Sequence, residues 1–323
     1  MDRNAAIFRI LAKEIRRILE QSDADFNEVQ EIRLRAEAPL LLICRDREYG
    51  VTPAGILKEE IRGVHMVTRE EIRETMEYIS RYSLYAFEEE LRRGFITVQG
   101  GHRVGLAGKT VAEDENIRTM KYISFINVRL SHQVLGCGDS VMPYIWEDGQ
   151  VLHSLIISPP GCGKTTLLRD LIRQLSTGSR GRRGVTVGVV DERSELGACY
   201  QGVPQNDLGI RTDVLDCCPK ARGMMMLIRT MSPQVIAVDE AGSRQDLEAM
   251  EYVMSCGCKL MATVHGSDLE DLRRKPVLQD MIQRKMFERY IVLGRRDRPG
   301  WVDQILDSGG RRLYGPERMA YGA

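Results

Sequence analysis

Residues 155–166 read Leu-Ile-Ile-Ser-Pro-Pro-Gly-Cys-Gly-Lys-Thr-Thr, an apolar run that passes into a loop with two glycines. The run is typical of a buried strand, and the residues after Lys164 have the apolar spacing of a helix. Gly161 and Gly163 allow backbone N–H groups to turn inward around a phosphate, where a side chain would obstruct them. The helix would direct its positive N-terminal end at the same anion. The stretch therefore predicts the phosphate-binding loop of a P-loop NTPase.

Each part of this loop has an expected task. Lys164 is expected to reach the β- and γ-phosphates of ATP, and Thr165 to place its hydroxyl on Mg²⁺. Such loops usually begin with glycine, and we expect the small residue Ser158 to be tolerated in its place. The residues expected to bind the nucleotide are Ser158, Pro159, Pro160, Gly161, Cys162, Gly163, Lys164, Thr165 and Thr166.

A P-loop requires a second strand that ends in an acidic residue near the metal. The run 235–238 supplies this strand, because Asp239 and Glu240 follow it directly. Asp239 is expected to hold Mg²⁺ through water, and Glu240 to polarise the attacking water as general base. The alternative, a dinucleotide-binding fingerprint, fails at Thr166, where a third glycine is required, and keeps only Asp191 in its support. The acidic pair favours a hydrolase.

Polar residues follow two further predicted strands. Thr263 and His265 come at the end of one, and either is a candidate sensor of the γ-phosphate. Glu192 and Glu195 follow the other, where they either hold water or metal or cap the next turn. A cation is also expected to stabilise the transition state. The candidates near these segments are Arg193, Arg211, Arg229 and Arg244.

The fold class expected from these patterns is α/β. Continuous apolar runs alternate with helices from residue 151 onward, which predicts a parallel sheet covered on both faces, of the RecA/AAA-like P-loop type. A smaller α+β domain is expected before it, with a first helix from Ile7 to Leu19, a capping box at Thr68 and Glu71, and a hairpin at Gly100-Gly101. The expected boundaries are 1–135 for this domain, 136–150 for a linker, 151–300 for the ATPase domain and 301–323 for a C-terminal tail.

Composition narrows the setting in which the chain works. The 323 residues carry 46 basic and 46 acidic side chains, and aromatic residues make up only 6%. No aromatic-interleaved basic stripe runs along the sequence, so nucleic acid is not an expected partner. The eight cysteines lack metal-ligand spacing, and neither a signal peptide nor a membrane span is apparent. These features predict a cytoplasmic protein that reaches a membrane only through partners.

Several longer motifs resemble one known family. They are Tyr82–Leu91, Gly100–Gly108, Pro159–Asp170, Asp191–Glu195, Arg211–Asp216 and Gly223–Arg229. Together they are similar to the stage III sporulation protein AA family, over nearly the whole chain. The resemblance implies an ATPase of endospore-forming bacteria, in the mother-cell cytoplasm, related to the hexameric ATPases of type II and type IV secretion. It also implies catalytic roles for Arg229 and for His265, which falls where those ATPases have a histidine box.

The leading hypothesis is a ring-forming ATPase, a homo-oligomer of hexamer type, that serves the channel between mother cell and forespore. It would dock on membrane-embedded channel proteins through the N-terminal domain or through the basic segment Arg273–Arg298. One alternative is a nucleic-acid-dependent motor, supported by that segment and by the loop Arg180–Arg183. Another alternative is an ATP-gated scaffold with little turnover, against which Glu240 argues.

Overall fold

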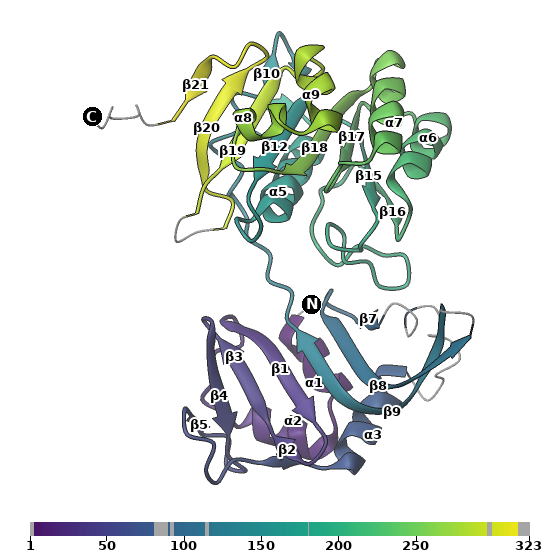
Figure 1. Cartoon of the computed structure of the whole chain (residues 1–323). Coiled ribbons are helices and arrows are strands. Elements are labelled where there is room, and N and C mark those ends of the chain that lie inside the picture. Colours follow the sequence, from purple (N-terminus) through teal and green to yellow (C-terminus); the bar gives the residue numbers. More distant parts are fainter. Residues whose placement is uncertain are drawn as a thin grey trace. The chain divides into compact units, whose positions relative to one another are not determined.

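The computed structural model describes residues 3–80, 90, 94–113, 116–179, 181–295 and 299–315. The chain divides into two compact units, each with its own sheet (Figure 1). Unit 1 comprises residues 1–132 and 198–205, and unit 2 comprises residues 133–197 and 206–323. Most of the motif Tyr82–Leu91, Arg180 and the last three residues of the basic segment Arg273–Arg298 lie outside the described residues.

Unit 1 is built on an antiparallel sheet of seven strands in the order β5-β4-β3-β1-β9-β8-β7. The strands are β1 (Val29–Arg35), β3 (Leu41–Cys44), β4 (Arg47–Val51), β5 (Leu57–Lys58), β7 (Phe95–Thr97), β8 (Arg103–Glu113) and β9 (Asn116–Arg129). The short strands β2 (Ala38–Pro39) and β6 (Met66–Val67) form a separate pair. The predicted hairpin is confirmed, because β7 and β8 pair across Gly100-Gly101, both of which have positive φ.

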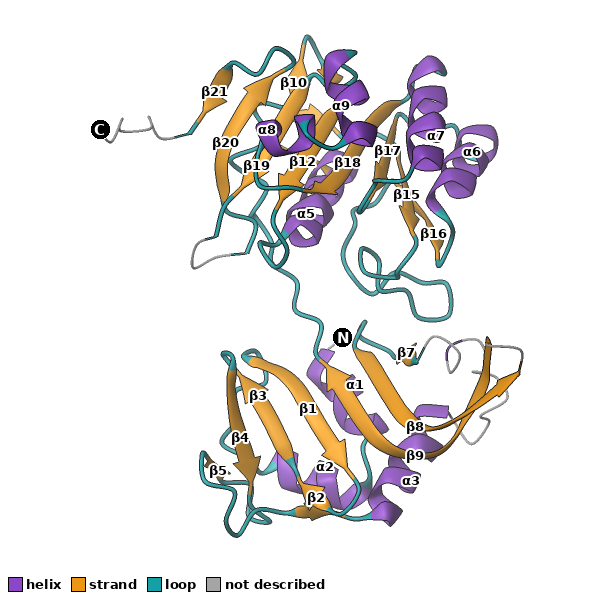
Figure 2. Cartoon of the chain, viewed as in Figure 1, coloured by secondary structure: helices purple, strands orange, loops and turns teal. Residues whose placement is uncertain are grey.

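Three helices cover one face of this sheet: α1 (Arg3–Ile10), α2 (Lys13–Glu20) and α3 (Arg69–Ser80) (Figure 2). The single helix predicted from Ile7 to Leu19 is wrong, since the helix breaks before α2. At the break the N–H of Ala12 donates to the hydroxyl of Thr75 on α3, 3.0 Å away, which satisfies a buried donor. The predicted capping box at the start of α3 is confirmed by hydrogen bonds in both directions between Thr68 and Glu71.

Unit 2 contains an eight-stranded sheet in the order β16-β15-β17-β18-β12-β19-β20-β21. The strands are β12 (Ser154–Ser158), β15 (Val187–Asp191), β16 (Thr212–Asp216), β17 (Val235–Val238), β18 (Lys259–His265), β19 (Arg289–Leu293), β20 (Val302–Asp307) and β21 (Arg312–Tyr314). The six from β16 to β19 in this order are parallel, whereas β20 and β21 are antiparallel. Two small hairpins accompany the sheet, β10 (Trp146–Glu147) with β11 (Gln150–Val151), and β13 (Gly178–Ser179) with β14 (Arg182–Arg183).

Helices pack on both faces of this sheet, as the sequence predicts. α5 (Lys164–Thr177) lies on one face, and α6 (Lys220–Thr230), α7 (Arg244–Ser255), α8 (Leu269–Arg273) and α9 (Pro276–Gln283) lie on the other. Successive residues of a strand enter opposite cores, for example Ile236 and Ala237 of β17. The α/β class with a mainly parallel sheet is confirmed. β20 and β21 extend the sheet within the segment that the sequence assigned to a tail, because Val302, Ile305 and Leu306 are buried there.

Within the described part of the chain, no helix combines the length and the apolar character that crossing a bilayer requires.

Candidate nucleotide site

The glycine-containing loop connects β12 to α5, as the sequence predicts. Gly161 has a φ of 76° and Gly163 a φ of 85°, a left-handed conformation that side chains rarely adopt. A Cβ on Gly161 would meet no atom within 4 Å, so the loop is open on that side. A Cβ on Gly163 would lie 2.3 Å from the amide nitrogen of Gly300, which excludes any larger residue there. The loop therefore offers space and backbone donors at the start of a 14-residue helix.

Ser158 stands where such loops usually have glycine, and its environment explains why it is tolerated. The residue is fully buried, and its hydroxyl donates to the carbonyl of Pro159 at 2.7 Å. Its own carbonyl accepts from the N–H of Gly266 at 3.1 Å, after the neighbouring strand β18. The extra hydroxyl is therefore satisfied locally, without pointing into the loop.

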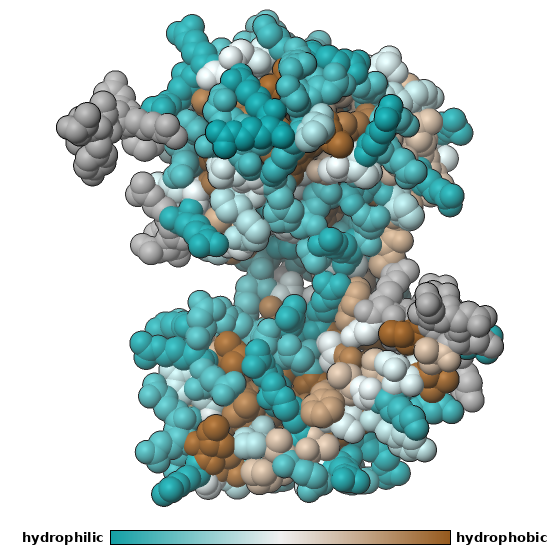
Figure 3. Space-filling model, viewed as in Figure 1, coloured by the Kyte–Doolittle hydropathy of each residue, from teal (hydrophilic) through white to brown (hydrophobic). Residues whose placement is uncertain are grey.

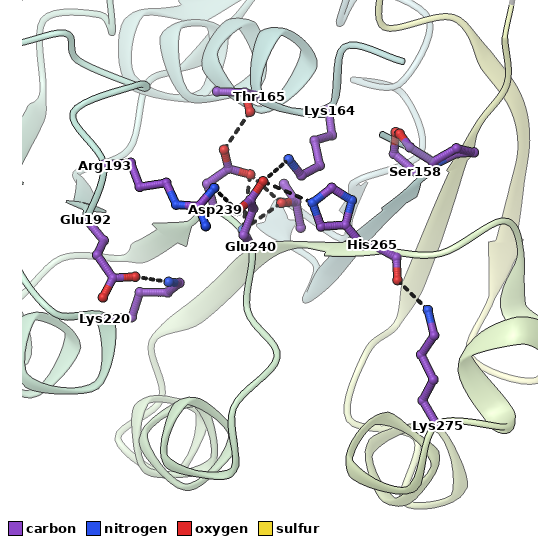
Figure 4. A network of polar contacts seen from close by, with 12 residues as sticks. Ser158, Lys164, Thr165, Glu192, Arg193, Lys220, Asp239, Glu240, His265 and Lys275 are labelled. Atoms are coloured by element: carbon purple, nitrogen blue, oxygen red, sulfur yellow. Dashed lines mark hydrogen bonds and ion pairs between the residues drawn. The ribbon is translucent and has the colours of Figure 1, made fainter. Parts of the chain in front are cut away.

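The first residues of α5 contact the two acids that follow β17 (Figure 4). The Lys164 ammonium lies 2.5 Å from a carboxylate oxygen of Glu240. The Thr165 hydroxyl donates to Asp239 over 2.6 Å. The parallel arrangement brings these groups together, because the carboxyl ends of β12 and β17 lie at one edge of the sheet, on either side of β18. Four side chains that the sequence predicted for one site are thus neighbours.

Thr263 on β18 links the two acids. Its hydroxyl donates to Asp239 and accepts from the N–H of Glu240, at 2.9 Å in the second case. Glu240 has a φ of 54°, which is uncommon for a residue with a side chain and is found disproportionately at functional sites. This turn directs the Glu240 carboxylate back toward Lys164. The sequence placed Thr263 only among possible phosphate sensors, and the structure shows a fully buried positioning contact.

Three cations or potential cations surround the Glu240 carboxylate. Besides Lys164, the guanidinium of Arg193 lies 2.5 Å from one oxygen and the Nε2 of His265 lies 3.0 Å from another. Burial of Glu240 raises its pKa, but the hydrogen bond and charge of Lys164, with contributions from His265 and Arg193, outweigh this effect. The pKa of Glu240 is therefore lowered, and the carboxylate is ionised at neutral pH.

The other candidate arginines lie elsewhere. Arg229 is exposed in the last turn of α6, before β17 begins, and so lies toward the edge of the sheet opposite Glu240. Arg211 donates to the backbone carbonyls of Ser176 and Thr177, and Arg244 pairs with Glu248 on the exposed side of α7. Of the four arginines, only Arg193 contacts the acids of the site in this chain.

The acidic residues after β15 are engaged locally. Asp191 accepts hydrogen bonds from the N–H groups of Glu195 and Gly197, both at 2.8 Å, so it organises the loop that follows. Burial raises the pKa of Asp191, against the effect of these donors. Glu192 forms an ion pair with Lys220, as Figure 4 shows. The Asp191 carboxylate therefore caps the loop that follows β15, and these contacts do not form a dinucleotide-binding arrangement.

A pocket of about 360 Å³ lies next to residues that contact the loop. Leu135, Cys137, Gly300, Trp301 and Tyr314 contribute to its wall. It is connected to the loop by two contacts, from the Gly300 N–H to the Cys162 carbonyl at 2.8 Å and from the Cys137 thiol to the Thr166 carbonyl at 3.7 Å. Such a mostly apolar recess beside a phosphate-binding loop suits a planar ring.

The residues present fit Mg²⁺ and a nucleotide triphosphate. Mg²⁺ takes oxygen ligands and usually keeps waters and phosphate oxygens, so it needs only one or two protein groups. Thr165 and Asp239 supply such oxygens beside the open cradle at Gly161. Among the described residues no cluster of three or more His, Cys, Asp or Glu side chains forms an alternative metal centre.

Comparison with known proteins identifies the family. The family model described as "Sporulation stage III, protein AA" matches residues 1–313. The chain belongs to this family. A similar relative, the stage III sporulation protein AA of Bacillus subtilis (strain 168), is 40% identical over 286 residues, which cover 88% of this chain and 89% of the relative.

Solved structures similar to this chain include an ATPase and a pilus retraction motor. The ATPase DotB of Legionella pneumophila has a TM-score of 0.57 at 16% identity, covering 91% of this chain and 80% of DotB. The pilus retraction motor PilT, solved with bound ADP, has a TM-score of 0.55 at 14% identity, covering 86% of this chain and 76% of PilT. At these identities the likeness shows the fold, which is that of a P-loop ATPase.

Proposed function

We propose that this chain is a Mg-ATP-hydrolysing motor subunit that assembles into a ring and powers the channel between mother cell and forespore during endospore formation. The observation that carries the proposal is the position of the Glu240 carboxylate. It lies 2.5 Å from Lys164 at the phosphate-binding loop and directly follows Asp239, which accepts from Thr165. A candidate base, a phosphate-binding cation and a metal-binding pair therefore share one edge of the sheet.

Residues of the loop and of α5 bind the substrate in this proposal. The backbone N–H groups from Gly161 to Thr165 surround the phosphates of ATP, and Lys164 turns from Glu240 to the β- and γ-phosphates. Thr165 and Asp239 hold Mg²⁺, which when bound supplies positive charge to the phosphate oxygens. The purine base lies in the pocket beside the loop, with Trp301 and Leu135 as its apolar walls.

Glu240 is the general base of the proposed reaction. Its lowered pKa keeps the carboxylate ionised, so that it orients the attacking water and accepts a proton at one of its oxygens. His265 and Thr263 hold it in place from β18. Arg193 contacts Glu240 as well, and its side chain is 62% exposed, which leaves it room to move to the γ-phosphate.

The setting follows from the family and from the relatives' fold. We assign the chain to the mother-cell cytoplasm, peripheral to the membrane, with membrane-embedded channel proteins as partners. DotB and PilT are motors or ATPases of the same fold, which supports a homo-oligomeric ring. Because Arg229 lies toward the edge opposite Glu240, any catalytic role for it would be in a neighbouring subunit's site.

A Glu240→Gln variant tests the proposal together with the dependence of activity on protein concentration. We expect turnover to fall about 10²- to 10⁴-fold while ATP binding persists, because the amide cannot accept the proton. Glu248→Gln, a matched change on the exposed side of α7, should leave turnover unchanged. Specific activity of the unaltered chain should rise with concentration, alongside a ring-sized mass by light scattering. Wild-type-like turnover of Glu240→Gln would refute the assigned base, and a fully active monomer would refute the ring.

A further inference from the structure

Among the residues that the structure describes, no helix lies over the central strands on one face of the unit 1 sheet. Ile32 and Leu34 of β1 point into the core formed with α1, α2 and α3. Side chains alternate along a strand, so Arg33 and Arg35 lie on the opposite face. Figure 2 shows the helices on one side of β1, β9 and β8, with the other side open. We call the part of the sheet formed there by β1, β9, β8 and β7 the open face.

Strand pairing places two aromatic rings on the open face. Opposite Arg35 on β9 is Phe125, which is 49% exposed. In the next row across the sheet, Arg33 pairs with Asn127, Asn127 with Gly105, and Gly105 with Phe95 of β7. Phe95 and Phe125, which supply the two phenyl rings, are about thirty residues apart in the sequence.

Small residues between the rings leave a hollow. Gly105 and Ala107 on β8 carry almost no side chain on this face, and Ala107 lies directly opposite Phe125. The hollow has a volume of about 350 Å³ and is lined in part by Arg33, Arg35 and Asn127 as well. It therefore combines a flat apolar wall with an amide and two guanidinium groups.

The open face is basic, although the chain as a whole carries no net charge. Strand register assigns it the basic residues Arg33, Arg35, Arg103 and Arg129, and the exposed Lys109 and Lys121 continue the β8–β9 ladder beyond the β-bulge that follows Ala107. The acids that pair with these cations among the described side chains are Glu31, with Arg33 and Arg129, and Glu48 of the neighbouring strand β4, with Arg33. The guanidinium of Arg103 lies over the ring of Phe95, 3.5 Å from its centre.

Three of these cations have no ion-pair partner among the described residues: Arg35, Lys109 and Lys121. Lys109 and Lys121 lie directly opposite each other on β8 and β9, and both are exposed. Like charges in this relation destabilise a sheet, so the arrangement has a cost that an anionic ligand would remove. In an ion-pair network with a purely structural role, positive and negative side chains would instead lie opposite each other on the paired strands.

We propose that the open face binds single-stranded nucleic acid. Bases stack on aromatic rings and on guanidinium planes, and phosphates contact lysine and arginine; the open face offers both kinds of group side by side. An acidic polypeptide would use the cations but would gain little from Phe125 and the hollow beside it. The sequence disfavoured nucleic acid because no basic stripe with aromatic residues runs along the chain, whereas the sheet brings basic and aromatic residues together from four strands, β1, β9, β8 and β7.

This inference is independent of the ATPase proposal, and its test uses the full-length chain without ATP. Fluorescein-labelled oligothymidylate and oligouridylate of fifteen nucleotides are titrated with the protein, and anisotropy is followed at several salt concentrations. We expect binding that weakens with salt, with a slope of about 0.7 per phosphate contact in the logarithmic plot. A duplex of the same length should bind more weakly. No binding of the single strands at low salt would overturn the proposal.

Two variants separate stacking from charge. Phe125→Ala should weaken binding about 5- to 100-fold, and Tyr252→Ala, a partly exposed aromatic on α7, should not change it. Lys109→Gln combined with Lys121→Gln should reduce the salt slope by about 1.4, for two lost phosphate contacts. If Phe125→Ala binds normally and a poly-glutamate peptide competes as well as the oligonucleotide, the face is a site for an acidic polypeptide and the proposal is wrong.

Discussion

The two large sheets of this chain differ in what covers them and in how their charges are arranged. In unit 2 the parallel sheet is buried between helices on both faces, and the acids of the candidate site, Asp239 and Glu240, lie where β17 ends. Each of the site cations Lys164 and Arg193 contacts Glu240. In unit 1 the described helices cover one face, and the open face presents Arg35, Lys109 and Lys121, which have no ion-pair partner among the residues that the structure describes.

This difference follows from strand connectivity. Parallel strands need crossover connections, and the connecting helices necessarily occupy the faces, so function is confined to the ends of strands. Antiparallel strands are joined by short turns, which leave a face available to solvent or to a ligand. The space-filling view in Figure 3 shows hydrophilic residues interspersed with apolar ones over unit 1, as a partly open sheet requires. The same chain therefore offers two kinds of binding surface.

The largest expected effect is on stability, and it contrasts the covered sheet with the open one. Ile236 of β17 is fully buried, so Ile236→Ala should lower the free energy of unfolding by about 2–5 kcal/mol. Phe125→Ala on the open face should cost about 0.5 kcal/mol or less. Urea denaturation of both variants measures the difference. Equal losses would show that Phe125 is packed in a core, contrary to the comparison.

The next largest effect is on nucleotide binding by Lys164, which forms an ion pair with Glu240 in the candidate site. Lys164→Ala removes a charged hydrogen-bond donor and should weaken binding of a fluorescent ATP analogue about 10- to 100-fold. Lys259→Ala is a suitable control, since Lys259 pairs with Glu288 where β18 begins, away from the loop. Unchanged affinity in Lys164→Ala would show that Lys164 does not bind the phosphates of ATP. It would also weaken the contrast between this ion-paired lysine and the cations of the open face.

The smallest effect is a pH dependence in unit 2. Asp170 on α5 is buried, which raises its pKa, but hydrogen bonds from the Gly138 N–H, Arg173 and Gln174 outweigh this and lower it. Because the folded-state pKa lies below the unfolded value, the carboxylate stabilises the fold above the unfolded pKa. This contribution is lost as the pH falls through the folded pKa.

The variant Asp170→Asn measures this contribution. It should be about 1–3 kcal/mol less stable than the unaltered chain at pH 7, because its amide would face three donors. The difference should shrink as the pH falls below 3.8, the ordinary pKa of aspartate. Urea midpoints from pH 7 to pH 2 would record it, with Glu248→Gln on the exposed side of α7 as the control. A difference that stays constant over this range would contradict the lowered pKa.

Local patterns were sufficient to predict much of the fold and part of the site. The strand before Ser158, the helix after Lys164 and the acids after β17 are each written in fewer than ten consecutive residues, so periodicity and turn chemistry reveal them. The family resemblance added the relation to secretion-type ATPases. The catalytic role that it implied for Arg229 stays a prediction, since Arg229 lies in the last turn of α6, before β17 begins. β20 and β21 were missed because their short, partly exposed strands give a weak signal.

The sequence by itself determined the phosphate-binding loop, the alternation of buried strands and helices, and the identity of Lys164, Thr165, Asp239 and Glu240 as neighbours in one site. Only the tertiary structure decided that Arg193 contacts Glu240, that Thr263 positions both acids, and that Phe95, Phe125 and several basic residues share one face of unit 1. The physical reason is the separation along the chain between the residues that interact. A loop or helix is fixed by interactions between near neighbours in the chain, whereas cross-strand contacts depend on strand order and register, which arise when the whole core packs.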